Sequence, residues 1–202
     1  VDGIAITPRT SEYLDDAFAL ATEVFAADSV LHNAFGVDLR TYRAALRSSF
    51  EAMTVQDLSF GAFDRGRCVG VIVASDVVHA LPDDADNPVS ALTADLTRTY
   101  VDVRQPCPGE AVLIDMAALH PDVRGRGLYP ALRRAVERRA RETGWRYVIG
   151  ELSSVVTQRV VLGHMGHVKL AEIAFDEFEW RGTRPFASIT SPPSIILSEG
   201  LL

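Results

Sequence analysis

Apolar residues recur along this chain at two spacings, one typical of strands and the other of helices. Short apolar runs predict strands over residues 3–7, 58–63, 68–75, 111–119, 146–151, 167–175 and 194–198. Apolar positions three or four residues apart predict helices over residues 11–26, 39–55, 128–144 and 157–165. Thr10 or Ser11 is the expected cap of the first helix, and Asp38 is the expected cap of the second. A break at residues 33–36 separates these two helices. Strands and helices therefore follow each other in a mixed order.

Residues 77–109 form an insertion between two of the predicted strands. The segment contains Pro82, Pro88, Pro106 and Pro108, and it predicts one helix from about Pro88 to Tyr100. It ends directly before the strand at residues 111–119. We expect this insertion to act as a lid, with a dimer contact and a plain loop as the alternatives.

A strand, a glycine-rich turn and a helix follow one another between Val112 and Tyr129. The turn reads Arg124-Gly125-Arg126-Gly127. Amide groups at a helix start have no intrahelical partner and the helix dipole adds positive potential, so such a turn binds anions. A dinucleotide fingerprint would need a glycine where Pro130 stands, and the Walker sequence is absent. The turn therefore predicts a site for another phosphate-bearing ligand, with a solvated turn as the alternative.

This segment resembles the coenzyme A-binding motif of the GCN5-related N-acetyltransferases, R/Q-x-x-G-x-G/A. Arg124 and Gly127 match its first two positions, whereas Tyr129 stands where the family has Gly or Ala. The resemblance covers about residues 4–200 and is specific between Leu113 and Leu132. It implies one acetyltransferase domain over residues 1–202, with the α/β acyl-CoA N-acyltransferase fold. That fold has a central mixed, mostly antiparallel sheet of about seven strands with helices on both faces.

The resemblance also implies which residues bind acetyl-CoA. Backbone groups at the end of the strand, at Met116, Ala117 and Leu119, would pair with the pantetheine arm as another strand would. The backbone amides of the following turn would hold the pyrophosphate; these belong to Arg124, Gly125, Arg126, Gly127, Leu128 and Tyr129. The ring of Tyr129 would either crowd this site or pack on the pantetheine.

Within the family, the chain is most similar to the arylalkylamine branch. The segment 25–31 is similar to the acidic-Pro-Leu segment of those enzymes, which places Asp28 at their acidic base and Ser29 at their proline. Ser153-Ser154 and residues 175–178 are similar to their C-terminal half. The tyrosine that often serves as general acid would map to Leu162, so the resemblance leaves the acid unassigned.

Two carboxylates are candidate catalytic bases. An amine attacks a thioester only when it is neutral, so a base must remove a proton from the ammonium form. Asp115 lies within the apolar run 113–117, where a buried acid needs a partner or a role. Asp28 is the second candidate. The alternatives are a structural role for Asp115 and a helix cap for residues 30–35 by Asp28.

Charge is distributed unevenly along the chain. The net charge is −7, yet residues 124–146 contain eight arginines and two glutamates, and residues 76–110 contain seven acids and two arginines. The basic segment favours a polyanionic cosubstrate, and the acidic one favours a cationic acceptor. The overall negative charge disfavours nucleic acid as a partner.

The composition sets further limits on partners and location. The chain has no run of eighteen apolar residues, so the sequence predicts no membrane span. Cys68 and Cys107 are far apart in sequence, which favours a reduced, cytoplasmic protein. Neither the cysteines nor the five histidines show the spacing of metal ligands, so we expect no metal.

The sequence thus predicts an acetyl-CoA-dependent N-acetyltransferase that acts on a small primary amine by direct attack in a ternary complex. One alternative is a catalytically degenerate relative that binds an acyl-CoA as a sensor or interaction module. Another is a structural domain whose turn binds no cofactor. O-acetylation stays open, as does a homodimer.

Overall fold

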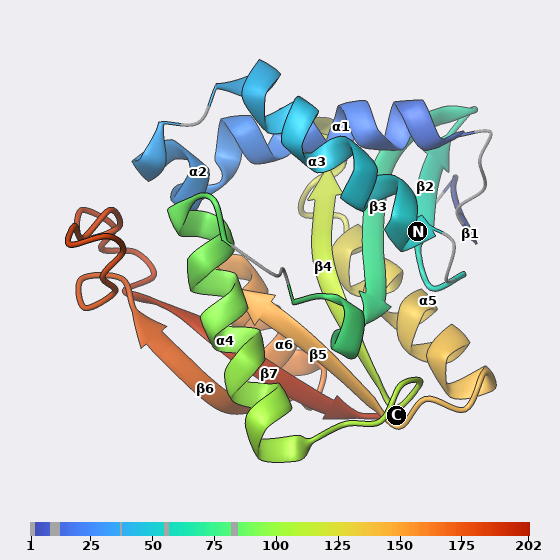
Figure 1. Ribbon diagram of the computed structural model, residues 1–202. Helices are drawn as coiled ribbons and strands as arrows, with labels where there is room; N and C mark the ends of the chain where they lie inside the picture. The colour runs from blue at the N-terminus through green and yellow to red at the C-terminus, as the bar shows by residue number, and fades with distance from the viewer. Residues whose placement is uncertain (1–2, 9–12, 37, 55–56, 82–84) are drawn as a thin grey trace.

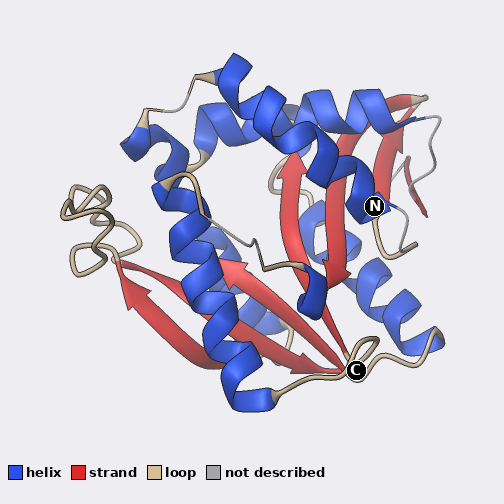
Figure 2. Ribbon diagram, in the orientation of Figure 1, coloured by secondary structure: helices blue, strands red, loops and turns tan. Residues whose placement is uncertain are grey.

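The computed structural model describes residues 3–8, 13–36, 38–54, 57–81 and 85–202. Seven strands form one sheet in the order β1-β2-β3-β4-β5-β7-β6. Helices α1, α3 and α4 cover one face of this sheet, here called the front face, and α5 and α6 lie behind it (Figure 1). Figure 2 shows the same layers coloured by type of element. The predicted α/β fold, with a mostly antiparallel sheet between two layers of helices, is confirmed.

Among the strands of the described residues, β4 and β5 are the one pair of neighbours that runs parallel. Every other neighbour is antiparallel. The strands are β1 (Ile4–Pro8), β2 (Phe60–Asp64), β3 (Arg67–Asp76), β4 (Ala111–Leu119), β5 (Tyr147–Leu152), β6 (Val168–Ala174) and β7 (Ser194–Leu201). The helices are α1 (Leu14–Asp28), α2 (Val30–Phe35), α3 (Leu39–Thr54), α4 (Pro88–Arg104), α5 (Leu128–Glu142) and α6 (Val155–His164).

Two helix starts differ from the sequence prediction, each because of a serine cap. A short helix, α2, occupies most of the predicted break, and Ser29 rather than Asp28 caps it. Helix α6 begins two residues earlier than predicted because Ser154 and Thr157 form a capping box. The predicted caps Thr10 and Ser11 lie outside the described residues. Asp38 does accept from the backbone of Thr41 at 3.0 Å, as a cap should.

The insertion is a packed part of the fold. Helix α4 starts at an Asn87 cap and buries Leu92, Leu96 and Tyr100 against the front of β4, β5 and β7. It runs one turn past the predicted end, where Arg104 binds Glu199 of β7 at 2.7 Å. Its role as a lid stays a prediction.

Apolar packing separates the two faces. Leu113 of β4 belongs to the cluster under α4, whereas Val112 and Ile114 pack against α5 on the other face. None of the helices in the described part of the chain combines the length and the apolar character that a membrane span requires.

Candidate active site

The sheet opens in its middle, where β4 and β5 stop pairing. Their register runs from Ala111 opposite Tyr147 to Ile114 opposite Gly150, and ends there. Beyond that point β4 continues for five residues along β3, and β5 continues along β7. The diverging strands leave backbone groups on one edge of β4 without a strand partner. An extended ligand could pair with that edge as a strand would.

Asp115 stands at the point where this opening begins. Val73 of β3 pairs with Met116 and Ala74 pairs with Ile114, so Asp115 is the extra residue of a β-bulge. The bulge coincides with the end of the pairing between β4 and β5. Ser75 donates a hydrogen bond to Asp115 Oδ2 at 2.8 Å.

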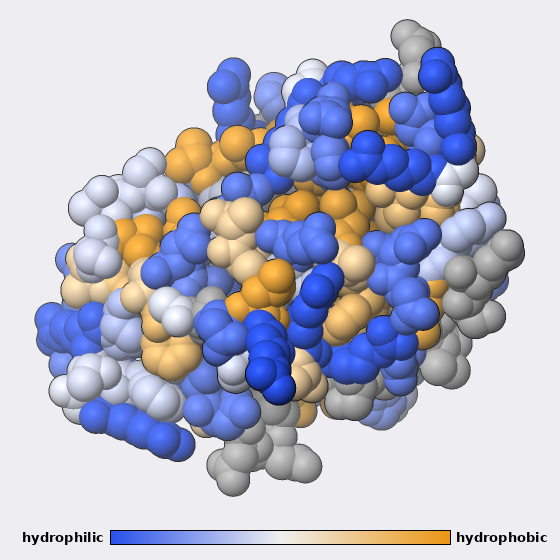
Figure 3. Space-filling model, turned by 90° about the horizontal axis from the view of Figure 1, so that it is seen from above, coloured by the Kyte–Doolittle hydropathy of each residue, from blue (hydrophilic) through white to orange (hydrophobic). Residues whose placement is uncertain are grey.

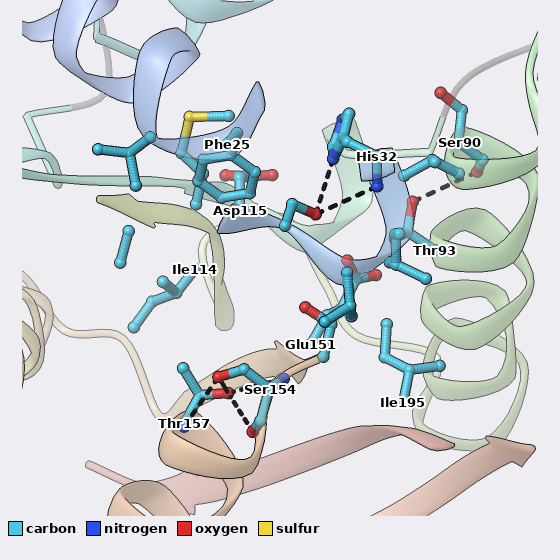
Figure 4. A pocket seen from close by; sticks show the side chains of 18 of the residues that line it. Phe25, His32, Ser90, Thr93, Ile114, Asp115, Glu151, Ser154, Thr157 and Ile195 are labelled. Atoms are coloured by element: carbon cyan, nitrogen blue, oxygen red, sulfur yellow. Dashed lines mark hydrogen bonds between the residues drawn. The ribbon is translucent and has the colours of Figure 1, made fainter. Parts of the chain in front are cut away.

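A cavity of about 360 Å³ lies at the opening, within the size range of ligand pockets. Its lining comes from both faces of the sheet (Figure 4). The front wall has side chains from α1, α2, α3 and α4, among them Phe25, His32, Tyr42, Thr93 and Thr97. The back wall has side chains from the start of α5 and from the β5–α6 junction: Tyr129, Arg133, Ser153, Ser154 and Thr157. The cavity therefore connects the two faces between β4 and β5.

Two carboxyl groups point into this cavity, one from each diverging strand. Asp115 comes from β4, and Glu151 follows Gly150, the last residue of β5 that pairs with β4. Burial raises the pKa of Asp115 to about 7, although the Ser75 hydrogen bond opposes the shift. Burial likewise raises the pKa of Glu151 to about 8, opposed by a hydrogen bond from Thr97 and assisted by the charge of Asp115. Both groups can therefore exchange protons near neutral pH.

Aromatic rings form the upper part of the front wall. The His32 ring lies 4.5 Å from the Tyr42 ring and 5.9 Å from the Phe25 ring, measured between centroids. Ser29 Oγ lies 2.8 Å from His32 Nδ1, and burial lowers the pKa of His32. The imidazole is therefore neutral at pH 7 and adds no cation to the front wall. Seen from above, apolar side chains also gather near the middle of the molecular surface, between polar ones (Figure 3).

The back wall begins at the start of α5, which has the features of an anion site. Gly127 precedes the helix with φ +75°, and no side chain caps the first turn of α5 within the described residues. A Cβ at Gly127 would meet no atom within 4 Å, so the backbone angle alone favours glycine there. The first amides of α5 are thus open to an anionic group.

Tyr129 and Arg133 lie one turn apart on α5 and meet at the back wall. Arg133 Nη1 donates to the Tyr129 hydroxyl oxygen at 3.2 Å. Arg133 is 1% exposed, and among the described residues its Nε and Nη2 have no hydrogen-bond partner. Tyr129 packs against Leu152 and Val161, between α5 and α6. A buried cation without a carboxylate partner adds positive potential to this side of the cavity.

Several solved structures similar to this chain are named as amine N-acetyltransferases. No protein-family model matches the chain, and no curated protein matches its sequence. The C-terminal condensation domain of Ebony, in complex with β-alanyl-dopamine, superposes with a TM-score of 0.86 at 17% identity, covering 98% of this chain and 99% of that one. The mosquito arylalkylamine N-acetyltransferase-like 5b superposes with a TM-score of 0.81 at 17% identity, covering 98% of this chain and 100% of that one. The polyamine N-acetyltransferase of Drosophila melanogaster superposes with a TM-score of 0.77 at 18% identity, covering 98% of this chain and 100% of that one.

This chain has the GCN5-related N-acetyltransferase fold. At 17–18% identity the superpositions show the fold alone, and the arylalkylamine and polyamine N-acetyltransferases stand among the similar structures, as the sequence resemblance predicted. The opening between β4 and β5 lies within this acetyltransferase fold, immediately before the glycine turn that carries the resemblance.

The acetyltransferase fold brings most of the predicted site residues to one place. Asp115, Met116, Ala117 and Tyr129 line the cavity. Leu119 contributes its carbonyl oxygen to the Arg124 guanidinium, at 3.1 Å from Nη2. The exposed turn that contains Gly125 and Arg126 follows, and Leu128 is buried at the start of α5. Their role in binding acetyl-CoA stays a prediction.

Asp28 lines the cavity too, but it is paired. Its carboxylate forms an ion pair with Arg124, the first residue of the motif. Both side chains are near half exposed, at 46% and 42%. Asp28 is thus anchored to the residue expected beside the pyrophosphate, whereas Asp115 has a neutral partner.

Sequence reasoning missed Glu151, Thr97 and Phe25. Glu151 ends an apolar strand, which was the available signal for a buried acid. The Tyr42 ring also lines the cavity. Four other aromatic rings are buried in the core, those of Phe50, Tyr100, Phe175 and Phe178. No group of three His, Cys, Asp or Glu side chains suited to a metal occurs in the part of the chain that the structure describes.

Proposed function

We propose that this protein transfers the acetyl group of acetyl-CoA to a small primary amine in a ternary complex. The observation that carries the proposal is the cavity between β4 and β5, which has titratable acids toward the front and positive potential at the back. Such a passage suits two substrates that enter from opposite faces of the sheet. Direct attack then needs no covalent intermediate on the protein.

The donor would bind along the back of the opening. The edge of β4 from Met116 to Leu119 would pair with the pantetheine arm, and the amides between Arg124 and Tyr129 would hold the pyrophosphate. Because Tyr129 packs between α5 and α6, its ring would contact the pantetheine or turn aside for it. Arg133, buried behind it, adds attraction for the anionic cosubstrate.

The acceptor would bind at the front. An ammonium ion is attracted to the Asp115 carboxylate, while the rings of Phe25, His32 and Tyr42 suit an apolar or aromatic remainder. Asp115 takes one proton from the ammonium, which frees the nitrogen lone pair for attack on the thioester carbonyl. With a pKa of about 7, this carboxyl is matched to that task at neutral pH. Amine-acetylating enzymes among the similar structures support this acceptor class.

A direct assay tests the proposal. The protein is mixed with acetyl-CoA and a panel of arylalkylamines, aliphatic amines and diamines, and released coenzyme A thiol is measured together with the mass of the product. A reaction without amine reports hydrolysis alone. Thiol release that depends on an amine, with the N-acetylated product, supports the proposal; alcohols in the same panel test for O-acetylation.

Two other results are informative. Binding of acetyl-CoA without product from any amine would favour a degenerate acyl-CoA-binding module, the alternative to which Tyr129 and Leu162 at motif positions point. Absence of acetyl-CoA binding by the folded protein would favour a structural domain and end the proposal.

A further inference from the structure

The reaction proposed above needs a proton donor that the sequence leaves unassigned. When the carbon–sulfur bond breaks, the electron pair leaves on the coenzyme A sulfur, and a nearby acid lowers the barrier by giving it a proton. Leu162 stands where the tyrosine acid of the resemblance would map, and it packs against the cluster of Leu152, Val161 and Ile196. Its side chain has no proton to give, so the acid must come from elsewhere in the cavity.

Glu151 has the position that such an acid requires. It lies on β5 immediately after Gly150, the last residue that pairs with β4, and therefore at the start of the opening. Its carboxyl points into the cavity between Asp115 and the start of α6, where Ser154 and Thr157 lie (Figure 4). It thus stands between the candidate base and the back wall, where the donor would enter.

The hydrogen bond to Glu151 fixes one of its two carboxyl oxygens. Thr97 of α4 donates to Oε1 at 2.5 Å, which leaves Oε2 as the oxygen that can carry a proton. Burial and the nearby Asp115 carboxylate both favour the neutral form of Glu151, whose pKa they raise to about 8. At neutral pH this residue is therefore mostly an acid, whereas Asp115 is about half ionised.

Three hydroxyl groups near the back wall, those of Ser154, Thr157 and Tyr129, take part in local structure. Thr157 Oγ1 donates to the Ser154 carbonyl oxygen at 2.9 Å, and Ser154 Oγ accepts from the Thr157 amide. The Tyr129 hydroxyl oxygen accepts from Arg133. These contacts hold α6 and α5 in place. Because the Tyr129 hydroxyl only accepts, its proton stays free, and Tyr129 is the competing acid that Tyr129→Phe tests below.

We propose that Glu151 is the general acid of the acyl transfer, positioned by Thr97. The inference rests on the proposed function. The Asp115 carboxylate takes one proton from the ammonium, and the neutral nitrogen forms a bond to the thioester carbon. The carbon–sulfur bond then breaks, and Glu151 gives its proton to the sulfur to form the thiol. The Glu151 carboxylate takes the second proton from the nitrogen as the amide forms, and Asp115 releases the first proton to water.

The proposal predicts a pH profile with two limbs. Rate rises as Asp115 ionises near pH 7 and falls as Glu151 loses its proton near pH 8. Because the two groups interact, the two limbs report apparent pKa values that belong to the pair rather than to either residue. The other titratable or charged side chains among the described residues that line this cavity are Asp28 on α1, His32 on α2, Tyr42 on α3, and Tyr129 and Arg133 on α5.

The decisive variant is Glu151→Gln, because an amide cannot donate a carboxyl proton or titrate. We expect kcat with acetyl-CoA and the best amine to fall about a hundredfold and the alkaline limb of kcat to disappear. Glu142→Gln, at the exposed end of α5, makes the same chemical change outside the cavity. It should leave kcat and its alkaline limb unchanged. Circular dichroism and thermal melts check that the variants are folded.

Two further measurements separate an acid from a structural residue. S-phenyl thioacetate has a far better leaving group than S-ethyl thioacetate, so Glu151→Gln should be impaired with the ethyl donor and close to the parent with the phenyl donor. Thr97→Val removes a hydrogen bond that lowers the pKa of Glu151, so the alkaline limb should move to higher pH. The second variant keeps the test available if Glu151→Gln does not fold.

The proposal is overturned if Glu151→Gln keeps the alkaline limb and the parental kcat, or if both thioacetates are impaired equally. A limb that disappears in Tyr129→Phe and stays in Glu151→Gln would assign the acid to Tyr129 instead. These outcomes require an active parent, so they are distinct from failure of the proposed function, in which the parent acetylates no amine.

Discussion

The two walls of the cavity carry different kinds of charge. At the front, Asp115 and Glu151 have pKa values raised by burial to about 7 and 8, so they gain and lose protons near neutral pH. At the back, Arg133 keeps a fixed positive charge, since arginine does not lose its proton in proteins. The front wall can therefore take part in proton transfer, whereas the back wall can only attract and hold an anion. This division matches an acceptor that must lose protons and a donor that carries phosphates.

The largest expected effect separates the two candidate bases of the front wall. Asp115→Asn keeps the shape of the side chain and removes the base, so kcat/KM should fall about a hundredfold or more. Asp28→Asn should change it less than about tenfold, because Asp28 is half exposed and paired with Arg124. Steady-state kinetics with one amine compare the two. A larger loss of kcat/KM in Asp28→Asn than in Asp115→Asn would make Asp28 the catalytic base.

Charge at the start of α5 provides the next test, this time of the back wall. Gly127→Asp and Gly127→Asn have the same size and place the same strain on a residue with φ +75°, but only Asp repels phosphate. Calorimetric titration with acetyl-CoA should show Gly127→Asp binding at least about tenfold more weakly than Gly127→Asn. Gly66→Asp, in the β2–β3 hairpin, is the control for charge elsewhere. Equal affinities for the two Gly127 variants would place the pyrophosphate away from this turn.

The titratable front wall should also reduce stability as the pH rises. The pKa of Asp115 is near the ordinary 3.8 in the unfolded chain but about 7 in the folded one. The folded state therefore holds more protons between these pH values and loses stability as the pH rises through them. Asp115→Asn should thus raise Tm at pH 7.5, by roughly 10 °C, and leave it nearly unchanged at pH 4. Thermal melts at both pH values check this. An equal change at both pH values would point to packing rather than ionisation.

A smaller effect is expected from the hydroxyl beside Asp115. Ser75 donates to Oδ2 at 2.8 Å and lowers the pKa of Asp115. Ser75→Ala should move the acid limb of the rate profile to higher pH and reduce the rate at pH 7 by a few-fold. The alkaline limb should stay in place. If the alkaline limb moves instead, Asp115 is not the group that must be ionised.

The local elements and the glycine turn could be predicted from the sequence because they depend on neighbouring residues. Strand β4 has the predicted bounds, and the turn before α5 lies where the motif placed it. Asp115 stood out as an acid in an apolar run. The serine caps at Ser29 and Ser154 were missed because Val30, Val155 and Val156 follow them, and β-branched residues weaken a helix prediction.

The contacts of the site depend on tertiary structure and could not be predicted. Glu151 meets Thr97 across 54 residues of sequence, and Arg124 meets Asp28 across 96. The bulge at Asp115 arises from its register with β3, which no local pattern encodes. The sequence therefore indicated where a cosubstrate would bind, and the fold added which acids face it.

A crystal structure of the protein with coenzyme A tests the central claim most directly. We predict the pantetheine arm between the diverging ends of β4 and β5, paired with the backbone of Ala117 and Leu119, with the pyrophosphate on the amides before α5 and the thiol near Glu151. Coenzyme A bound elsewhere on the surface, with no ligand between the diverging ends of β4 and β5, would contradict the account.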